Sequence, residues 1–269
     1  MANQFSKYLK KFGLGQTVGS LRITDAMRES LGGKGASLAV MSNMGFNIPP
    51  GITFATDISK FYSNLNTEES ISLIDNLATF ARKETVHIEK HFGYTPMYAV
   101  RSGAPVSMPG MMDTVLNVGI HRENINEWAE RIGERTAWDC YARLLMTIAT
   151  SIFGINDKQI SDIEVSVSKF KYGEKEKPES YVDFNSKHLM KFADKLENYL
   201  DSQTPFYLST FFSQISCRKG NVLFSDFING DNCIHHQLCL TIMTVLRSWN
   251  SERAQTYRKI NKLVKKGGR

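Results

Sequence analysis

Apolar residues recur at the spacing of an α-helix through most of this 269-residue chain, and this periodicity restricts the possible folds more than any other feature. In residues 68–92 the apolar side chains share one stripe, which predicts a long amphipathic helix. The same spacing predicts helices over residues 123–153, 186–200, 204–217 and 235–249, with a further helix in the basic C-terminal part. We therefore expect a mixed α/β first part and a mostly helical remainder.

Two short strand-like stretches enclose an aperiodic loop. Residues 96–101 and 114–119 each read as a strand, and the segment between them reads SGAPVSMPGMMD. Long loops without regular structure are uncommon inside compact domains and are often functional. Residues 157–183, which are polar and weakly periodic, read instead as a linker or a surface excursion.

A glycine turn precedes a predicted helix near the start of the chain. In the run LGGKGASLAVMSNMGFNIPPG the apolar spacing predicts a helix from about Gly33-Lys34 to Asn43 or Met44, because the following prolines prevent its continuation. The ammonium group of Lys34 and the first free N–H groups of such a helix suit one shared anion. The spacing is not that of a Walker A loop. Spacing alone favours an ordinary glycine turn followed by a solvent-exposed lysine.

Arg101 is a stronger candidate for an anion contact. It ends a predicted strand and enters a loop that contains Gly103 and Gly110. A guanidinium group binds phosphate through two hydrogen bonds, and glycines allow the backbone to approach closely. Three methionines suit an adaptable apolar cover over adenine or a phosphate chain. They are Met108, Met111 and Met112.

Asp113 follows the last of these methionines and is placed to anchor the exit of the loop. The alternative for the whole segment is a structural turn whose arginine pairs with a surface carboxylate. The length of the loop, without any period, favours a functional role.

The charge of +6 is local and does not point to nucleic acid. Residues 252–269 contain seven basic residues and one acidic residue, so the rest of the chain is balanced. A balanced remainder offers no broad basic face to follow a nucleic-acid backbone, and we expect no nucleic-acid partner. No apolar run is long enough to cross a membrane, and the N-terminal residues lack the pattern of a signal peptide. Four cysteines without a CxxC pair fit a reducing compartment, so we expect a cytoplasmic protein.

Four zinc-type ligands fall within seven residues: Cys233, His235, His236 and Cys239. Structural zinc sites usually join two separated pairs of ligands, and four ligands this close rarely complete a tetrahedron. We expect buried cysteines and histidines at a helix start, and no metal. The histidines lie on predicted helices or at their starts, without a recognisable nucleophile beside them, so we assign no catalytic residue.

Three runs together resemble one enzyme family. They are LGGKGASLAVMSNMGFNIPPGITFAT (31–56), AVRSGAPVSMPGMMDTVLNVGI (99–120) and LRSWNSERAQTYRKIN (246–261). In this order and at about this spacing they resemble the N-terminal nucleotide-binding region of the pyruvate, phosphate dikinases. The segment SMPGMMDT is similar to the dikinases and differs from the related phosphoenolpyruvate synthases. The resemblance is strong over residues 8–121 and 235–262 and loose between them.

The resemblance implies an ATP-binding module of the ATP-grasp type. In the family, ATP phosphorylates a histidine on a separate swivelling domain, which carries the phosphoryl group to pyruvate. Lys34 and Arg101 match the lysine and the arginine that hold the ATP phosphates in the family. The segment 107–112 matches its phosphate-covering loop, and Arg253 and Arg258 match helix positions with a supporting role. The residues of that loop taken as cofactor-binding are Ser107, Met108, Gly110, Met111 and Met112.

The implied fold class is α/β (α+β), the first lobe of an ATP-grasp-type domain with a largely helical insertion. We expect the N-terminal lobe at 1–121, the helical insertion at 122–234, and C-terminal helices that return to the first lobe at 235–269. In the family a second lobe follows and supplies the carboxylates that hold magnesium. The histidine carrier and the pyruvate-binding barrel are also separate from this region.

Two functions follow from these expectations. The first is ATP binding for a dikinase-like phosphotransfer that this chain does not complete alone, with Mg²⁺ bound only if a partner polypeptide supplies the second lobe. The alternative is a non-catalytic nucleotide-binding, decoy or regulatory module that associates with a full-length dikinase or another protein, because a lone lobe exposes apolar surface.

Overall fold

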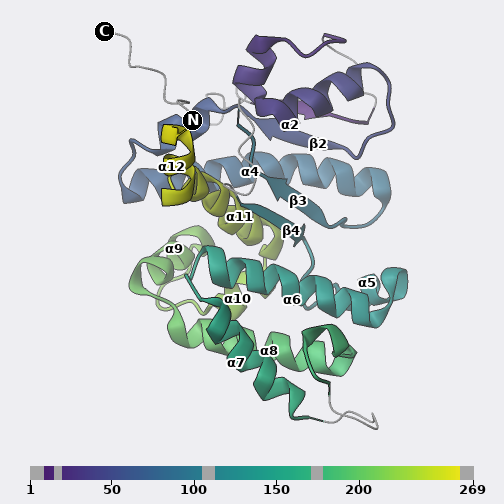
Figure 1. The fold of residues 1–269 in the computed structure, drawn as a ribbon, viewed down its shortest axis with the longest axis vertical. Helices are drawn as coiled ribbons and strands as arrows, with labels where there is room; N and C mark the ends of the chain where they lie inside the picture. The colour runs from purple at the N-terminus through teal and green to yellow at the C-terminus, as the bar shows by residue number, and fades with distance from the viewer. Residues whose placement is uncertain (1–8, 15–19, 105–112, 171–177, 261–269) are drawn as a thin grey trace. The chain divides into compact units, whose positions relative to one another are not determined.

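The computed structural model describes residues 9–14, 20–104, 113–170 and 178–260. These residues form an α+β structure in which helices predominate and the strands pair into two small sheets (Figure 1). The elements in chain order are β1 (Leu9–Phe12), α2 (Asp25–Asn43), β2 (Gly51–Phe54), α3 (Asp57–Tyr62), α4 (Thr67–Phe92), β3 (Tyr98–Arg101), β4 (Thr114–Val118), α5 (Ile125–Ile132), α6 (Glu134–Ser151), α7 (Asp157–Ser168), η2 (Tyr181–Asp183), α8 (Ser186–Gln203), α9 (Phe206–Ser216), α10 (Phe224–Asn229), α11 (Cys233–Trp249) and α12 (Glu252–Ile260). None of the helices in these ranges has the length and hydropathy needed to cross a membrane.

The chain divides into two structural units. The first unit comprises Met1–Pro96, Arg101–Thr114 and Ile242–Arg269, and the second comprises Met97–Val100 and Val115–Thr241. The chain therefore passes between the units within β3, β4 and α11. The three-part division at residues 121 and 234 stays a prediction.

In the first unit a short antiparallel sheet supports α2. Strands β1 and β2 pair with Leu9 opposite Phe54 and Phe12 opposite Gly51. Helix α2 lies so close to the sheet that a Cβ atom on Gly35 would come within 2.6 Å of the Thr53 side chain. These two strands are not predicted by the periodicity, because their side chains do not alternate between buried and exposed.

Helix α2 starts earlier than the sequence predicts and contains a break. It begins after Thr24, whose side-chain oxygen accepts a hydrogen bond from the Met27 N–H at 3.2 Å, as an N-cap does. Gly32 then interrupts the helix with φ 70° and ψ 168°. The predicted helix from Gly33 to Asn43 is confirmed as the second segment of α2. The segment before the break was missed.

The long helix α4 and the strands of the second sheet agree with the sequence predictions. Helix α4 begins at a capping box, in which Asn66 and Glu69 each bond the backbone N–H of the other, and it ends at Gly93 in the left-handed conformation. Strands β3 and β4 lie within the two predicted stretches and pair with each other.

In the second unit α6 and α8 form the centre of the core. Both helices contribute side chains with 0% exposure. These are Tyr141, Leu144 and Leu145 from α6, and Leu189, Phe192 and Leu196 from α8. The single helix predicted over residues 123–153 is two helices, α5 and α6, because Gly133 takes φ 89° between them.

The linker predicted over residues 157–183 is wrong for its first half, which is helix α7. Asn156 and Gln159 form a capping box at its start, and Ile160 and Val167 are buried. Two buried side chains in twelve residues leave too weak a stripe to detect by periodicity. The short helix α10 was missed because its six residues are too few to show a helical period. Helices α8, α9, α11 and α12 confirm the predicted helices.

Candidate functional site

The glycine turn in α2 and the segment after Arg101 form one structure within the first unit. The Gly33 N–H donates a hydrogen bond to the Ala104 carbonyl at 3.0 Å. A Cβ atom on Gly32 would lie 2.9 Å from the Ala104 nitrogen and 3.0 Å from the Gly103 carbonyl carbon, and φ 70° is itself unfavourable for other residues. The close approach of the two segments therefore requires glycine at position 32.

Lys34 extends from this turn along the same segment. Its ammonium Nζ donates to the Ser102 carbonyl oxygen at 3.2 Å, although the residue is exposed. An ammonium group has three N–H donors, so this bond leaves donors for a ligand. The contact places a positive charge beside the residue that follows Arg101.

Arg101 is the last residue of β3, and its side chain is exposed. It forms no hydrogen bond or ion pair with any residue that the structure describes. A guanidinium group with five donors in a planar fork is therefore available on the residue before Ser102, whose carbonyl Lys34 contacts. A planar fork together with a point charge is suited to binding a polyphosphate.

One sequence expectation at this turn needs correction. The first N–H groups of the helix that carries Lys34 were expected to share an anion with its ammonium. The Gly33 N–H is occupied by the Ala104 carbonyl, so it is not available to an anion. Anion contacts by the side chains of Lys34 and Arg101 stay a prediction.

Five of the predicted contact residues lie outside the described residues. They are Ser107, Met108, Gly110, Met111 and Met112. Their role as a phosphate cover stays a prediction. Asp113, directly after them, is described: its Oδ1 lies 3.5 Å from Nη2 of Arg253 on α12.

Arg258, which the resemblance also singled out, contacts Trp249 within the first unit. Its Nη1 donates to the Trp249 carbonyl at 2.7 Å, and its guanidinium carbon lies 4.3 Å from the centroid of the Trp249 ring. Because Trp249 is the last residue of α11, Arg258 closes the end of that helix. It stabilises the turn between α11 and α12.

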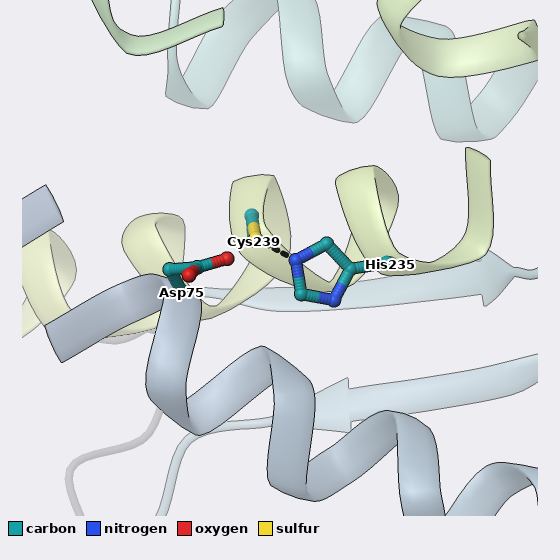
Figure 2. Close-up of side chains that lie close together, drawn as sticks. All are labelled: Asp75, His235 and Cys239. Atoms are coloured by element: carbon teal, nitrogen blue, oxygen red, sulfur yellow. Dashed lines mark hydrogen bonds between the residues drawn. The ribbon is translucent and has the colours of Figure 1, made fainter. Parts of the chain in front are cut away.

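The four metal-type ligands at the start of α11 do not form a common ligand set in the part of the chain that the structure describes. His236 stacks on Phe227 with centroids 4.2 Å apart, and its Nδ1 lies 2.8 Å from the Phe227 carbonyl. His235 Nε2 lies 3.5 Å from Cys239 Sγ one turn along the helix (Figure 2). Asp75, also drawn there, belongs to the first unit. His235 and Cys239 therefore offer two ligands, whereas a structural zinc site has four.

A buried charged network in the second unit was missed by the sequence analysis. The Arg122 guanidinium donates to the Glu197 carboxylate at 2.5 and 3.0 Å and to Asp194 at 2.7 Å. Tyr141 also donates to Glu197, and the Asn229 amide donates to the same carboxylate at 2.9 Å. Nothing in the local sequence marks residues 75 positions apart as partners.

The environment of this network changes the acidity of its members. Burial raises the pKa of the Tyr141 hydroxyl well above its usual value, and the neighbouring Glu197 carboxylate raises it further. Burial alone would lower the pKa of the Arg122 guanidinium, but the hydrogen bond and charge of Glu197 raise it on balance. The network therefore contains a permanent cation and a neutral hydroxyl. It joins the segment after β4 to α6, α8 and α10.

Known proteins resemble this chain over nearly its whole length. The pyruvate, phosphate dikinase of Mesembryanthemum crystallinum chloroplasts is 31% identical over 256 residues, which is 94% of this chain and 24% of the relative. The dikinase 1 of Zea mays chloroplasts is 33% identical over 264 residues, with the same two shares. The dikinase of Giardia intestinalis is 32% identical over 244 residues, 89% of this chain and 24% of the relative. No family model matches the chain.

The chain thus spans about a quarter of the length of the curated relatives it matches. The similarity agrees with the three quoted runs, and it extends across the segment where the sequence resemblance was loose. This protein is related to the pyruvate, phosphate dikinases and corresponds to one region of such an enzyme.

Proposed function

We propose that this chain is the first lobe of an ATP-grasp nucleotide-binding domain and that it binds the polyphosphate of ATP through Lys34 and Arg101. One observation carries the proposal: the ammonium of Lys34 is hydrogen-bonded to the carbonyl of Ser102, the neighbour of Arg101. Lys34 thereby contacts the residue next to Arg101, 67 positions away in the sequence and in the same unit. The relation to the dikinases supports ATP as the ligand.

In this proposal the two side chains have different tasks. Arg101 holds two phosphate oxygens through its planar fork, and Lys34 neutralises charge as a compact cation. Phosphoryl transfer depends on positioning and on charge neutralisation, and both residues serve these ends. The segment 107–112 would cover the phosphates, as the family resemblance implies.

The described residues around Lys34 and Arg101 do not fit a magnesium ion. Magnesium in phosphoryl-transfer sites is held by carboxylates together with substrate phosphates. The carboxylate on this segment, Asp113, is paired with Arg253. We propose that a second lobe, in a partner polypeptide or a full-length dikinase, supplies the ligands of Mg²⁺. Transfer to a histidine carrier and on to pyruvate would require those further parts.

Calorimetric titration with ATP tests the proposal. The variants Lys34→Ala and Arg101→Ala are each expected to weaken binding by about 1.5–3 kcal/mol, the usual worth of hydrogen bonds to charged groups, which is roughly 10- to 150-fold in Kd. Lys60→Ala is the matched control, since Lys60 is an exposed lysine of the same unit that pairs with Asp57. Equal isotherms for wild type and all three variants would refute the site.

A second function is favoured by exposed apolar side chains in the first unit. Leu21, Met44 and Phe46 are 57%, 52% and 62% exposed. The Asn43 side chain donates to the Ser20 carbonyl at 2.9 Å, which joins the segments that carry them. Such a surface suits a non-catalytic module that associates with another protein. Size-exclusion chromatography with and without a full-length dikinase tests this: a shifted complex that Phe46→Ser abolishes supports it, and a monomer in both runs contradicts it.

A further inference from the structure

We infer that Arg253 of α12 is a positioning residue for Arg101 and acts through Asp113; this inference rests on the proposed function. Arg101 ends β3 and Asp113 directly precedes β4, the strand that pairs with β3. Asp113 Oδ1 lies 3.5 Å from Arg253 Nη2. An element near the C-terminal end of the described chain thus contacts the strand pair that presents Arg101.

Several contacts hold helix α12, which carries Arg253, in place. Arg258 binds both the carbonyl and the ring of Trp249, which holds the helix against the end of α11. The Ser251 hydroxyl accepts a hydrogen bond from the Ala254 N–H at 3.2 Å, and Ala254 is fully buried. The Asn250 amide donates to the Ser63 hydroxyl at 2.9 Å, so the turn is also tied to the end of α3.

The ion pair also has an electrostatic consequence. Asp113 places a carboxylate on the segment that carries Arg101, and an uncompensated negative charge there repels a polyphosphate. The guanidinium of Arg253 offsets that charge. Its side chain is 63% exposed, so the effect of the pair is screened by salt. Arg253 therefore orients the start of β4 and keeps the region around Arg101 positive.

A charge-swap experiment tests the inference. Arg253→Glu places two carboxylates together and is expected to weaken ATP binding about three- to tenfold at low salt, while AMP binding changes less because it has a single phosphate. The double variant Asp113→Arg with Arg253→Asp restores the pair in reverse and is expected to bind ATP within about twofold of wild type. A merely structural defect would not discriminate between ATP and AMP.

Lys259→Glu is the matched control, because Lys259 is an exposed residue of the same helix and the net charge changes equally. If Arg253→Glu and Lys259→Glu weaken ATP binding equally, the inference is overturned, and only long-range charge is at work. If the swap fails to restore binding while its circular dichroism spectrum is native, the inference is also overturned. If Arg101→Ala leaves ATP affinity unchanged in the same series, the proposed function itself is contradicted.

Discussion

Two arginines, one at the end of β3 and one after β4, stand in contrasting surroundings. Arg101 ends β3 in the first unit, with an exposed side chain and no ion pair among the described residues. Arg122 follows β4 in the second unit and is engaged by Glu197, Asp194 and the rings of α6. The same guanidinium chemistry thus serves the fold at Arg122, and in the proposed function it serves a ligand at Arg101. The surrounding acceptors decide between these roles.

The largest expected effect tests the structural arginine. Arg122→Met leaves the buried Glu197 without its cation, and we expect a loss of about 3 kcal/mol in unfolding free energy, near the lower end for a broken buried pair because Arg122 is partly exposed. Urea denaturation followed by circular dichroism measures this. Arg143→Met, which breaks an exposed pair with Asp139, is expected to cost about 0.3–0.5 kcal/mol. Similar losses for Arg122→Met and Arg101→Met would remove the contrast between the regions.

The next effect concerns the turn at Gly32, which lies against Gly103 and Ala104. Gly32→Ala introduces a Cβ atom 2.9 Å from the Ala104 nitrogen at a positive φ, and we expect a loss of about 1–3 kcal/mol in stability. ATP affinity should fall about tenfold or more, because the altered turn displaces Lys34. Gly33→Ala is the control, since nothing lies within 4 Å of its added Cβ. Equal ATP affinities of the two variants would show that the conformation of the Gly32 turn does not affect ATP binding.

The smallest effect is a pH dependence confined to the second unit. Because the folded-state pKa of Tyr141 is raised, its contribution to stability is complete below the unfolded-state pKa of about 10 and is lost as pH rises beyond it. Tyr141→Phe should cost about 1 kcal/mol at pH 7 for the lost hydrogen bonds and give a shallower decline above pH 10. Unfolding free energies measured from pH 7 to 11 decide this. An unchanged alkaline slope would mean that Tyr141 does not control it.

The sequence predicted the elements whose apolar stripes are long. Helix α4 follows from its apolar stripe, and the second segment of α2 follows from apolar spacing and the prolines after it. Strands β1 and β2 were missed because their side chains do not alternate between buried and exposed, and α7 was missed because two buried side chains make a weak stripe. The division of the chain into units depends on contacts between distant segments, which no local pattern records.

The candidate site was predicted in part. Residue type and family resemblance pointed to Lys34 and Arg101. The contact of the Gly33-Lys34 turn with the segment after Arg101 could not be deduced, because it depends on backbone carbonyls of Ser102 and Ala104, and a carbonyl carries no sequence signal. Arg122 was missed for a related reason: its partners lie on α8, more than 70 positions away.

The hydrogen bond between Gly33 and Ala104 joins main-chain atoms only, so among replacements at these two positions only proline at position 33 removes its donor. A mutational survey would accordingly find position 104 permissive and position 32 intolerant, although both belong to one contact. The bond depends on the absence of a side chain at Gly32, because a Cβ atom there would keep the two backbones apart. Variants that fill this space would reveal the junction, whereas alanine scanning of its polar neighbours would pass over it.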